Sequence, residues 1–181
     1  MITAQSEQIK YERMHQVPGY SAGPGASYVP CLLNYLEKGD SVIDFGCGSG
    51  EAGRLLAHLQ YKVLNVDITN AVRYSGVPFI RASLHELPDD LPKATWGFCT
   101  DVMEHLPEEW VAPALNGMRG RVKSIFFSIS GVPDGWGKHI GERLHLTVKP
   151  VEWWIERISK HWKQVERLNK SDCAFEIVGR G

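Results

Sequence analysis

The stretch VIDFGCGSG, residues 42–50, decides the fold of this chain. It is an apolar run that carries one carboxylate, Asp44, followed by three glycines spaced by two. Such a run is typical of a buried strand in a parallel sheet, and a glycine turn after the strand lets the backbone approach a ligand closely. A carboxylate buried at a strand end is costly unless a hydrogen bond or a cationic group compensates it. The stretch therefore predicts a ligand-binding turn.

Short apolar runs alternate with helical patterns beyond this stretch. We predict strands over residues 41–46, 62–68, 78–83, 96–101 and 124–130, and helices over 51–60, 108–120 and 150–162. Two final runs, 163–169 and 173–179, are joined by a connection too short for a parallel crossover, so we expect an antiparallel hairpin. The pattern predicts an α/β protein with a doubly wound, mostly parallel seven-stranded sheet that ends in this hairpin.

Length and composition fit one structural domain. The chain has 181 residues, of which 43% are hydrophobic, so disorder of the whole chain is excluded. The N-terminus lacks the apolar centre of a signal peptide, and no apolar run reaches membrane-spanning length. We therefore expect a cytoplasmic protein without a membrane partner. The cysteines form no C-x-x-C pair, so we expect reduced thiols in or near the core at Cys31, Cys47, Cys99 and Cys173.

Charge is distributed unevenly along the chain. Residues 1–118 carry more acidic than basic side chains, and residues 119–181 carry more basic ones. A basic C-terminal portion suits an anionic substrate, but solvated helix faces explain it equally simply, and we favour that interpretation. Charge by itself does not indicate strong binding to nucleic acid.

A dinucleotide fingerprint competes for the same glycines. Gly48, Gly50 and Gly53 satisfy G-x-G-x-x-G, and Asp67 follows at the distance of a ribose-binding acid. That motif would place a pyrophosphate on the helix start, close to Asp44 and Glu51. A positively charged part of a ligand suits these carboxylates better, so we keep a nicotinamide-dependent oxidoreductase only as a third interpretation.

The segment DFGCGSG at 44–50 resembles the first motif of the class I S-adenosylmethionine-dependent methyltransferases. The order of elements, including the closing hairpin, resembles the Rossmann-like fold of this family over nearly the whole chain. The resemblance implies S-adenosylmethionine as cofactor and S-adenosylhomocysteine as product. It also implies an N-terminal lid or helical segment over 1–40 and a catalytic, cofactor-binding region over 41–181, within one structural domain.

The same resemblance assigns the cofactor contacts. Asp44 is expected near the amino-acid end of the cofactor, where ammonium and sulfonium charges explain a buried carboxylate, and Asp67 is expected at the ribose hydroxyls. The family often has Asp or Asn near the adenine after the third strand, whereas this chain offers Ser83 and Leu84. The segment before that strand is also too short for much of a helix. The cofactor-binding residues we expect are Asp44, Gly46, Cys47, Gly48, Gly50, Asp67, Ile68, Ser83, Leu84 and Asp101.

The fourth predicted strand ends in TDVMEH, which supplies candidates for chemistry. The spacing of Asp101, Glu104 and His105 places them on one side of a helical turn. Family members with D-x-x-E-H here resemble small-molecule methyltransferases, and the motifs of DNA amine and cytosine-C5 methyltransferases are absent from the sequence. His105 is the first candidate base, because histidine titrates near neutral pH. A histidine that only packs or hydrogen-bonds locally is the alternative.

A metal site is a sharper hypothesis for these residues. Some O-methyltransferases of quinone precursors and of small-RNA ends are similar at E-x-x-E-H, and there a divalent ion polarises the acceptor hydroxyl. His145 would then be the distant ligand, although a substrate-loop residue or a packed histidine is the alternative. Because the first acid here is Asp101, we do not favour a divalent metal and assign no metal site. The catalytic candidates remain His105, Glu104 and His145.

Aromatic residues are candidates for an acceptor pocket. The loop after the fifth strand and the N-terminal segment usually cover the active site in this family, which points to Tyr20, Trp136, Trp153 and Trp154. For Trp154 we favour packing in the core, since it shares a helical stripe with Ile158. The glycine-rich segment over 11–25 is expected to be a lid, with Tyr11 and Tyr20 as contacts.

These inferences predict methyl transfer from S-adenosylmethionine to O or N of a small or medium-sized acceptor. A non-catalytic module that binds S-adenosylmethionine is one alternative, because the cofactor region is trimmed. A methyltransferase directed at RNA or protein is another, because of the basic C-terminal portion; we do not favour a nucleic-acid partner.

Overall fold

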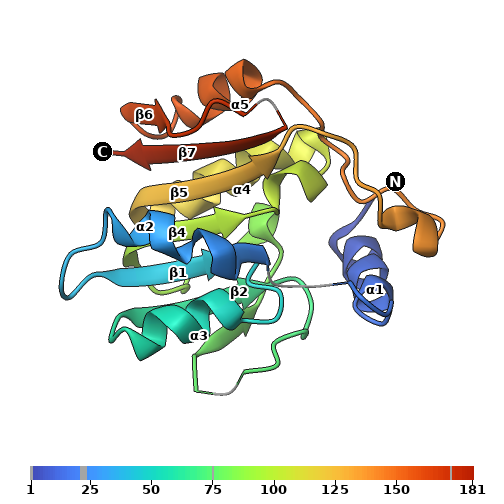
Figure 1. The fold of residues 1–181 in the computed structure, drawn as a ribbon, viewed down its shortest axis with the longest axis horizontal. Coiled ribbons are helices and arrows are strands. Elements are labelled where there is room, and N and C mark those ends of the chain that lie inside the picture. Colours follow the sequence, from blue (N-terminus) through green and yellow to red (C-terminus); the bar gives the residue numbers. More distant parts are fainter. Residues whose placement is uncertain (1, 21–23, 75, 172) are drawn as a thin grey trace.

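A computed structural model describes residues 2–20, 24–74, 76–171 and 173–181. One seven-stranded sheet forms the centre, in the order β3-β2-β1-β4-β5-β7-β6 (Figure 1). Strands β1 to β5 run parallel, whereas β7 is antiparallel to both β5 and β6, which confirms the predicted fold class and closing hairpin. The strands are Ser41–Phe45 (β1), Lys62–Asp67 (β2), Phe79–Arg81 (β3), Ala94–Thr100 (β4), Val122–Ser130 (β5), Gln164–Arg167 (β6) and Ala174–Arg180 (β7).

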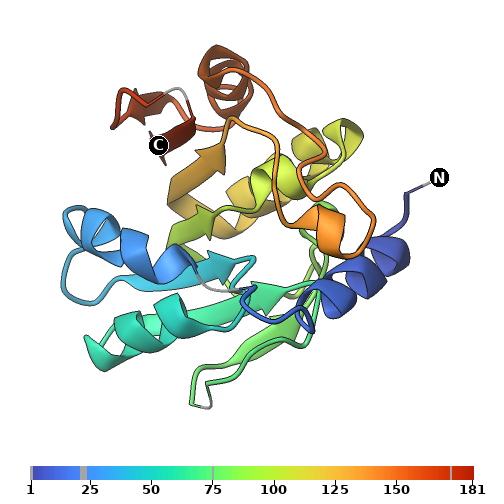
Figure 2. The same ribbon diagram turned by 45° about the vertical axis from the view of Figure 1, so that its right-hand side comes forward.

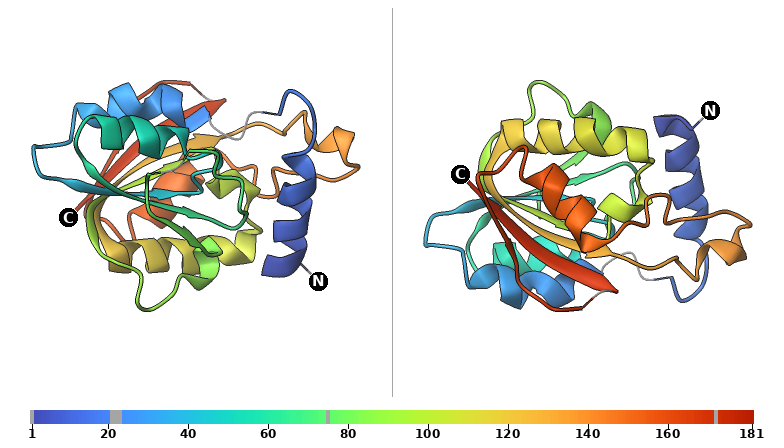
Figure 3. Two further views of the ribbon diagram at one scale, coloured as in Figure 1. Left: turned by 90° about the horizontal axis from the view of Figure 1, so that it is seen from below. Right: turned by 90° about the horizontal axis from the view of Figure 1, so that it is seen from above.

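Helices cover both faces of the sheet, as a doubly wound fold requires (Figure 3). On one face α2 and α3 bury apolar side chains such as Leu32 and Leu56. On the other face α4 and α5 bury apolar side chains such as Leu115 and Trp154. The α-helices are Ala4–Met14 (α1), Val29–Leu33 (α2), Glu51–His58 (α3), Glu108–Arg121 (α4) and Val151–Ile158 (α5), and short 3-10 turns are Pro24–Tyr28 (η1), Leu84–Glu86 (η2), Met103–His105 (η3) and Gly137–His139 (η4).

The predicted elements are present, and their ends differ by a few residues. The largest difference is in α5, which ends at Ile158 rather than at residue 162. Trp162 nevertheless stays in the core, because its side chain is buried and its Nε1 donates to the Lys123 carbonyl at 3.2 Å. Hydrophobic burial and a backbone hydrogen bond from the Trp162 N–H to the Ile158 carbonyl at 3.0 Å together set the position of Trp162.

The strand order reverses next to β1. The chain runs outward from β1 to β2 and β3, and then returns to place β4 on the other side of β1. In open α/β sheets a ligand site lies at the carboxyl ends of the strands at such a point. The glycine turn after β1 lies at this place.

The N-terminal segment has two parts with different packing. Turn η1 and helix α2 lie against the α3 face of the sheet, where Val29 and Leu32 are buried. Helix α1 stands beside the loop that follows β5 (Figures 1 and 2). Arg13 joins α1 to this loop, since its guanidinium donates to the Glu142 carboxylate at 2.6 Å and to the Ile140 carbonyl at 3.0 Å. Residues 21–23 of the predicted lid lie outside the described residues.

The cysteine prediction is partly wrong. Cys47 and Cys99 are buried and Cys31 is half-buried, but Cys173 is exposed in the turn before β7. A short turn between β7 and the edge strand β6 has too few neighbours to bury a side chain. Among the described helices, none combines the length and the apolar character needed to cross a membrane.

Candidate functional site

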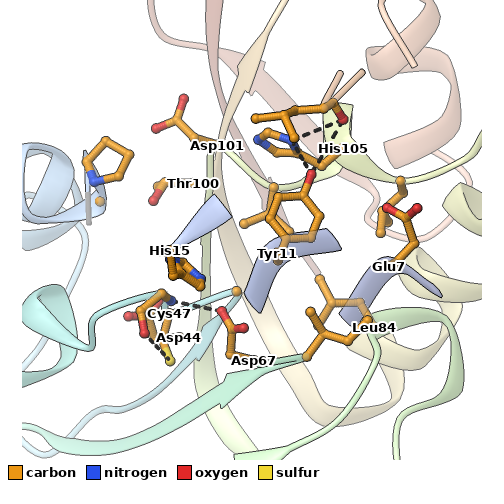
Figure 4. A pocket seen from close by; sticks show the side chains of 18 of the residues that line it. Glu7, Tyr11, His15, Asp44, Cys47, Asp67, Leu84, Thr100, Asp101 and His105 are labelled. Carbon is orange, nitrogen blue, oxygen red and sulfur yellow. Dashed lines mark hydrogen bonds between the residues drawn. The ribbon is translucent and has the colours of Figure 1, made fainter. Parts of the chain in front are cut away.

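A cavity of about 420 Å³ lies at the carboxyl ends of β1, β2 and β4 (Figure 4). Most of the predicted site residues line it, although they come from β1, from β2 and from the segments that follow strands β1 to β5. Gly50 and Glu104 are exceptions and do not reach its surface. The predicted residues in the lining are Asp44, Gly46, Cys47, Gly48, Asp67, Ile68, Ser83, Leu84, Asp101, His105 and His145.

Asp44 is buried near the end of β1, with 2% of its surface exposed. Its Oδ2 has no hydrogen-bond partner among the described residues. Burial, together with the nearby charge of Asp67, raises the pKa of Asp44 to about 7. A buried carboxyl oxygen without a partner is costly, so this position fits a cationic or hydrogen-bonding ligand group.

The glycines after β1 shape the floor of the cavity. Gly46 has φ +79°, and a Cβ atom built there would collide with the side chain of Val102. Gly50 caps the start of α3 with φ +79°, and a Cβ atom there would lie 3.0 Å from Asn65 Nδ2. Gly50 therefore sets the course of the backbone into α3 and is not itself a lining residue.

Asp67 at the end of β2 is held by the glycine turn. Its Oδ2 accepts from the Gly48 N–H at 2.9 Å, and its Oδ1 accepts from the Thr69 N–H at 2.8 Å and the Thr69 hydroxyl at 2.9 Å. These bonds fix the carboxylate at the cavity wall. A fixed acceptor of this kind suits the hydroxyl groups of a ligand.

Ser83 and Leu84 line the wall next to β3, as predicted. The Ser83 hydroxyl lies 2.7 Å from His85 Nδ1, and the His85 ring stacks on Trp110 with centroids 3.6 Å apart. Trp110 from α4 also lines the cavity. This wall therefore combines flat and apolar groups with few free polar atoms.

Glu104, His105 and His145 gather where η3 meets the loop after β5. One candidate ligand atom from each lies within 4.8 Å of the other two. Asp101 is not part of this cluster, and its carboxyl group points away from His105 (Figure 4). The expectation that Asp101 shares one side with the other two is wrong, because Asp101 has φ +55° and the turn starts only at Met103.

Hydrogen bonds to carbonyl groups define the protonation of both histidines. His145 Nδ1 lies 2.6 Å from the Val132 carbonyl, and His105 Nδ1 lies 3.2 Å from the Leu144 carbonyl. A carbonyl oxygen only accepts, so Nδ1 of each ring carries a proton, and a neutral ring then keeps its lone pair on Nε2. Burial and the neighbouring His145 lower the pKa of His105 to about 3, so this ring is neutral at pH 7.

Glu104 is fully buried behind the cavity wall. Its Oε1 accepts from the Ser130 N–H at 3.0 Å, and its Oε2 has no partner among the described residues. Burial is the main cause that raises the pKa of Glu104 to about 8. This free oxygen beside two histidine lone pairs is a donor set suited to a proton or a divalent cation.

Three solved structures share this architecture. A methyltransferase from Archaeoglobus fulgidus described as S-adenosylmethionine-dependent is 13% identical and has a TM-score of 0.71, with 86% of this chain and 92% of that chain covered. The magnesium protoporphyrin IX methyltransferase of Synechocystis, crystallised with S-adenosylhomocysteine, is 16% identical with a TM-score of 0.64, covering 98% and 95%. A TehB-like S-adenosylmethionine-dependent methyltransferase from Corynebacterium glutamicum is 14% identical with a TM-score of 0.64, covering 98% and 97%.

The chain has the fold of the class I S-adenosylmethionine-dependent methyltransferases. Its sequence matches no family model and no curated protein. Since the identities are low, the likeness is one of fold, and the site has to be argued from this chain's own residues.

Several residues around the site of this methyltransferase fold were not predicted from the sequence. They come from α1 and the residue that ends it, from β4, from α4 and from the loop after β5. Glu7, Tyr11 and His15 all line the cavity and lie four residues apart, a spacing that places them on one face of α1. That spacing is a signal in the sequence that would have found Glu7 and His15. The lining residues that were missed include Glu7, His15, Thr100, Trp110, Asp134 and Leu144.

The aromatic predictions have mixed outcomes in this methyltransferase fold. Tyr20 and Trp136 line the cavity, and their rings meet edge to face with centroids 5.7 Å apart. Trp154 is buried in the core, as favoured. Trp153 does not reach the cavity, because the Arg157 guanidinium covers its ring at 3.3 Å and Lys149 lies beside it.

Proposed function

We propose that this protein is an S-adenosylmethionine-dependent methyltransferase that acts on O or N of a small or medium-sized acceptor. The observation that carries the proposal is the buried Oδ2 of Asp44, which has no hydrogen-bond partner in the described part of the chain and lies beside the glycine turn, at the switch point of a methyltransferase fold. The solved structures support it, since one was crystallised with S-adenosylhomocysteine. We propose the cytoplasm as its location, which cell fractionation tests.

The lining residues fit the parts of this cofactor. Asp44 and Asp101 offer carboxyl groups to its ammonium and sulfonium charges, and the Asp67 carboxylate offers acceptors to the ribose hydroxyls. Ser83, Leu84 and Ile68 would border the adenine, and the turn at Gly46, Cys47 and Gly48 would pass below it. When bound, S-adenosylmethionine supplies an electrophilic methyl group.

The cluster on the other side of the cavity handles the acceptor in this proposal. His105 is a weak base with its pKa near 3, but its Nε2 is free to accept a hydrogen bond from an acceptor O–H or N–H. Glu104 has the higher pKa, about 8, so its ionised form, which becomes populated as the pH rises toward that value, is the stronger base for the proton. His105 and His145 would orient the acceptor and relay its proton toward Glu104.

Metal-assisted transfer to a hydroxyl is the second candidate, because Glu104, His105 and His145 meet so closely. Both Nδ1 atoms are engaged with backbone carbonyls, which is the support that metal-binding histidines usually have. The Glu104 Oε2, without a partner among the described residues, fits the same role. A divalent ion held there would polarise the acceptor hydroxyl.

Calorimetric titration with S-adenosylmethionine, S-adenosylhomocysteine and NADH tests the cofactor. We expect the first two to bind, NADH not to bind, and Asp67→Ala to abolish the binding because the ribose acceptor and the anchor of the glycine turn are lost. Asp89→Ala serves as control, since Asp89 is fully exposed and does not line the cavity. Binding of NADH alone would return the glycines to the dinucleotide interpretation.

Turnover separates an enzyme from a module that only binds the cofactor. The protein is incubated with S-adenosylmethionine carrying a labelled methyl group and with a cell extract as source of acceptors. Label in the small-molecule fraction supports the proposal. Label confined to RNA or protein would support the corresponding alternative, and binding without any transfer would support the non-catalytic module.

A further inference from the structure

The charged groups that reach the cavity are all acids or histidines. Five carboxyl groups line it, and among its described lining residues there is neither a lysine nor an arginine. The histidines are His15, His105 and His145. The carboxyl groups are those of Glu7, Asp44, Asp67, Asp101 and Asp134.

Two of the three histidines do not supply positive charge. Burial lowers the pKa of both His15 and His105, so these two rings are neutral at pH 7. Asp134, in contrast, accepts hydrogen bonds from the backbone N–H groups of Trp136, Gly137 and Leu144, which hold its pKa below the usual range. The cavity therefore keeps an ionised carboxylate without a facing cation.

The two basic residues of α1 beside the lining are engaged elsewhere. Lys10 is buried, forms an ion pair with Glu7 and donates to the Arg143 carbonyl at 3.4 Å. Arg13 pairs with Glu142 outside the lining. The charge of Lys10 offsets that of Glu7, so four carboxyl groups of the lining remain without a paired cation. Two of them, Asp44 and Asp101, each have an oxygen without a hydrogen-bond partner in the described part of the chain.

Part of the basic C-terminal portion lies away from the cavity. Arg119 donates to the carbonyls of His161, Val122 and Gly181, and Arg180 pairs with Glu166. These residues lie around α4, β6 and β7, at the end of the sheet away from β1 (Figure 1). Lys138 and Arg143 belong to the loop after β5, but neither lines the cavity, and the Arg143 guanidinium donates to the His145 carbonyl at 3.4 Å.

We propose that the methyl acceptor carries no anionic group and is a neutral or cationic small molecule. This inference rests on the proposed function and narrows its substrate class. Asp44 and Asp67 bind the cofactor in the proposed complex, so a carboxylate or phosphate of the acceptor would face the carboxyl groups of Asp101 and Asp134 and neither a lysine nor an arginine among the described lining residues. The aromatic walls at Tyr11, Tyr20 and Trp136 suit a flat or cationic molecule instead. We therefore expect acceptors with a carboxylate, and nucleic-acid backbones, to bind poorly.

Three probes of one shape test the proposal: benzyl alcohol, benzylamine and benzoate. Each is titrated by NMR into protein saturated with S-adenosylhomocysteine, with EDTA present so that no divalent cation pairs with benzoate. We expect benzyl alcohol and benzylamine each to bind more than about threefold tighter than benzoate, because like charges repel. Benzoate within threefold of either probe, tighter binding of benzoate, or no saturable binding of any probe would overturn the proposal.

Asp101→Asn provides a test by gain of binding. Asparagine tolerates the left-handed backbone at φ +55° better than other non-glycine residues, so the variant keeps the local conformation. We expect benzoate to bind tighter and benzylamine weaker than in the unmodified protein, while Asp89→Asn changes neither. An unchanged ratio of the two affinities in Asp101→Asn would contradict the role of charge.

The affinity for S-adenosylhomocysteine is measured first, in both variants. If that ligand does not bind the unmodified protein, the proposed function itself fails. If it binds and benzoate is not disfavoured, the cofactor assignment stands and only the inference about the acceptor is lost.

Discussion

The Tyr11 hydroxyl in helix α1 lies 2.7 Å from Nδ1 of His105. The same nitrogen faces the Leu144 carbonyl at 3.2 Å, and the two rings meet edge to face. Because the carbonyl only accepts, the proton on Nδ1 is shared between Leu144 and Tyr11, and Nε2 stays free. Helix α1 thus takes part in setting the chemical state of His105, whether that residue orients an acceptor or holds a metal.

Tyr11→Phe tests this relationship. We expect the variant to bind S-adenosylmethionine normally and to lose about tenfold in methyl transfer, the usual cost of removing a group that orients a functional histidine. In ¹⁵N NMR, the signals of His105, assigned with His105→Asn, should show a smaller population with the proton on Nδ1. Tyr35→Phe is the control, because Tyr35 packs on Trp96 away from the cavity. An unaltered tautomer in Tyr11→Phe would refute the idea.

Glu104 should make stability depend on pH. Its pKa is raised from 4.5 to about 8, so the folded state binds more protons than the unfolded state between these values. This group therefore stabilises the fold at low pH, and its contribution is lost as pH rises through about 8. The pKa of His105 is lowered from 6.5 to about 3, so this group makes stability rise with pH, and it does so only between about pH 3 and pH 6.5.

Urea unfolding of the unmodified protein and of Glu104→Gln between pH 6.5 and 9 measures the Glu104 effect without that of His105. Glutamine keeps the acceptor for the Ser130 N–H. We expect the free energy of unfolding to fall with pH more steeply in the unmodified protein. Parallel curves would show that Glu104 is ionised already at neutral pH.

Gly46 and Gly39 form a matched pair for the glycine turn. Both have positive φ, but a Cβ at Gly46 would strike Val102, whereas nothing lies within 4 Å of one at Gly39. Alanine at each position should cost about 1–2 kcal/mol for the left-handed backbone. We expect Gly46→Ala to lower the free energy of unfolding further and to weaken S-adenosylhomocysteine binding, which Gly39→Ala leaves intact. Thermal unfolding and calorimetry give both readouts, and equal behaviour of the two variants would count against the close packing of the turn.

A divalent ion decides between the two roles of the Glu104 cluster. If the cluster holds a metal, Mn²⁺ at a hundred times its dissociation constant should stabilise the fold by about 2.7 kcal/mol. His145→Asn should remove this effect, and His139→Asn, outside the cluster, should not. Stabilisation that EDTA reverses supports metal-assisted transfer. If Mn²⁺ does not change the unfolding temperature, the cluster binds a proton and not a metal ion.

Short-range patterns explain why so much of the fold was predictable. The apolar runs and the glycine turn locate β1 to β5 within a few residues, since strand burial and turn geometry are encoded locally. The short connection before β7 likewise allows only an antiparallel partner. The prediction that Asp101 shares one side with Glu104 and His105 failed, because the left-handed backbone of Asp101 departs from the helical geometry assumed for it.

The sequence by itself determined the parallel sheet, the hairpin, and the place of Asp44 and Asp67 at the ends of their strands, because strand periodicity and chain length leave few alternatives. Tertiary structure alone decided which distant groups meet. It placed Tyr11 against His105, His145 beside Glu104, and Arg119 against the C-terminal Gly181. Contacts between residues far apart in the chain depend on how the α1 helix and the loop after β5 dock, and no local pattern encodes that docking.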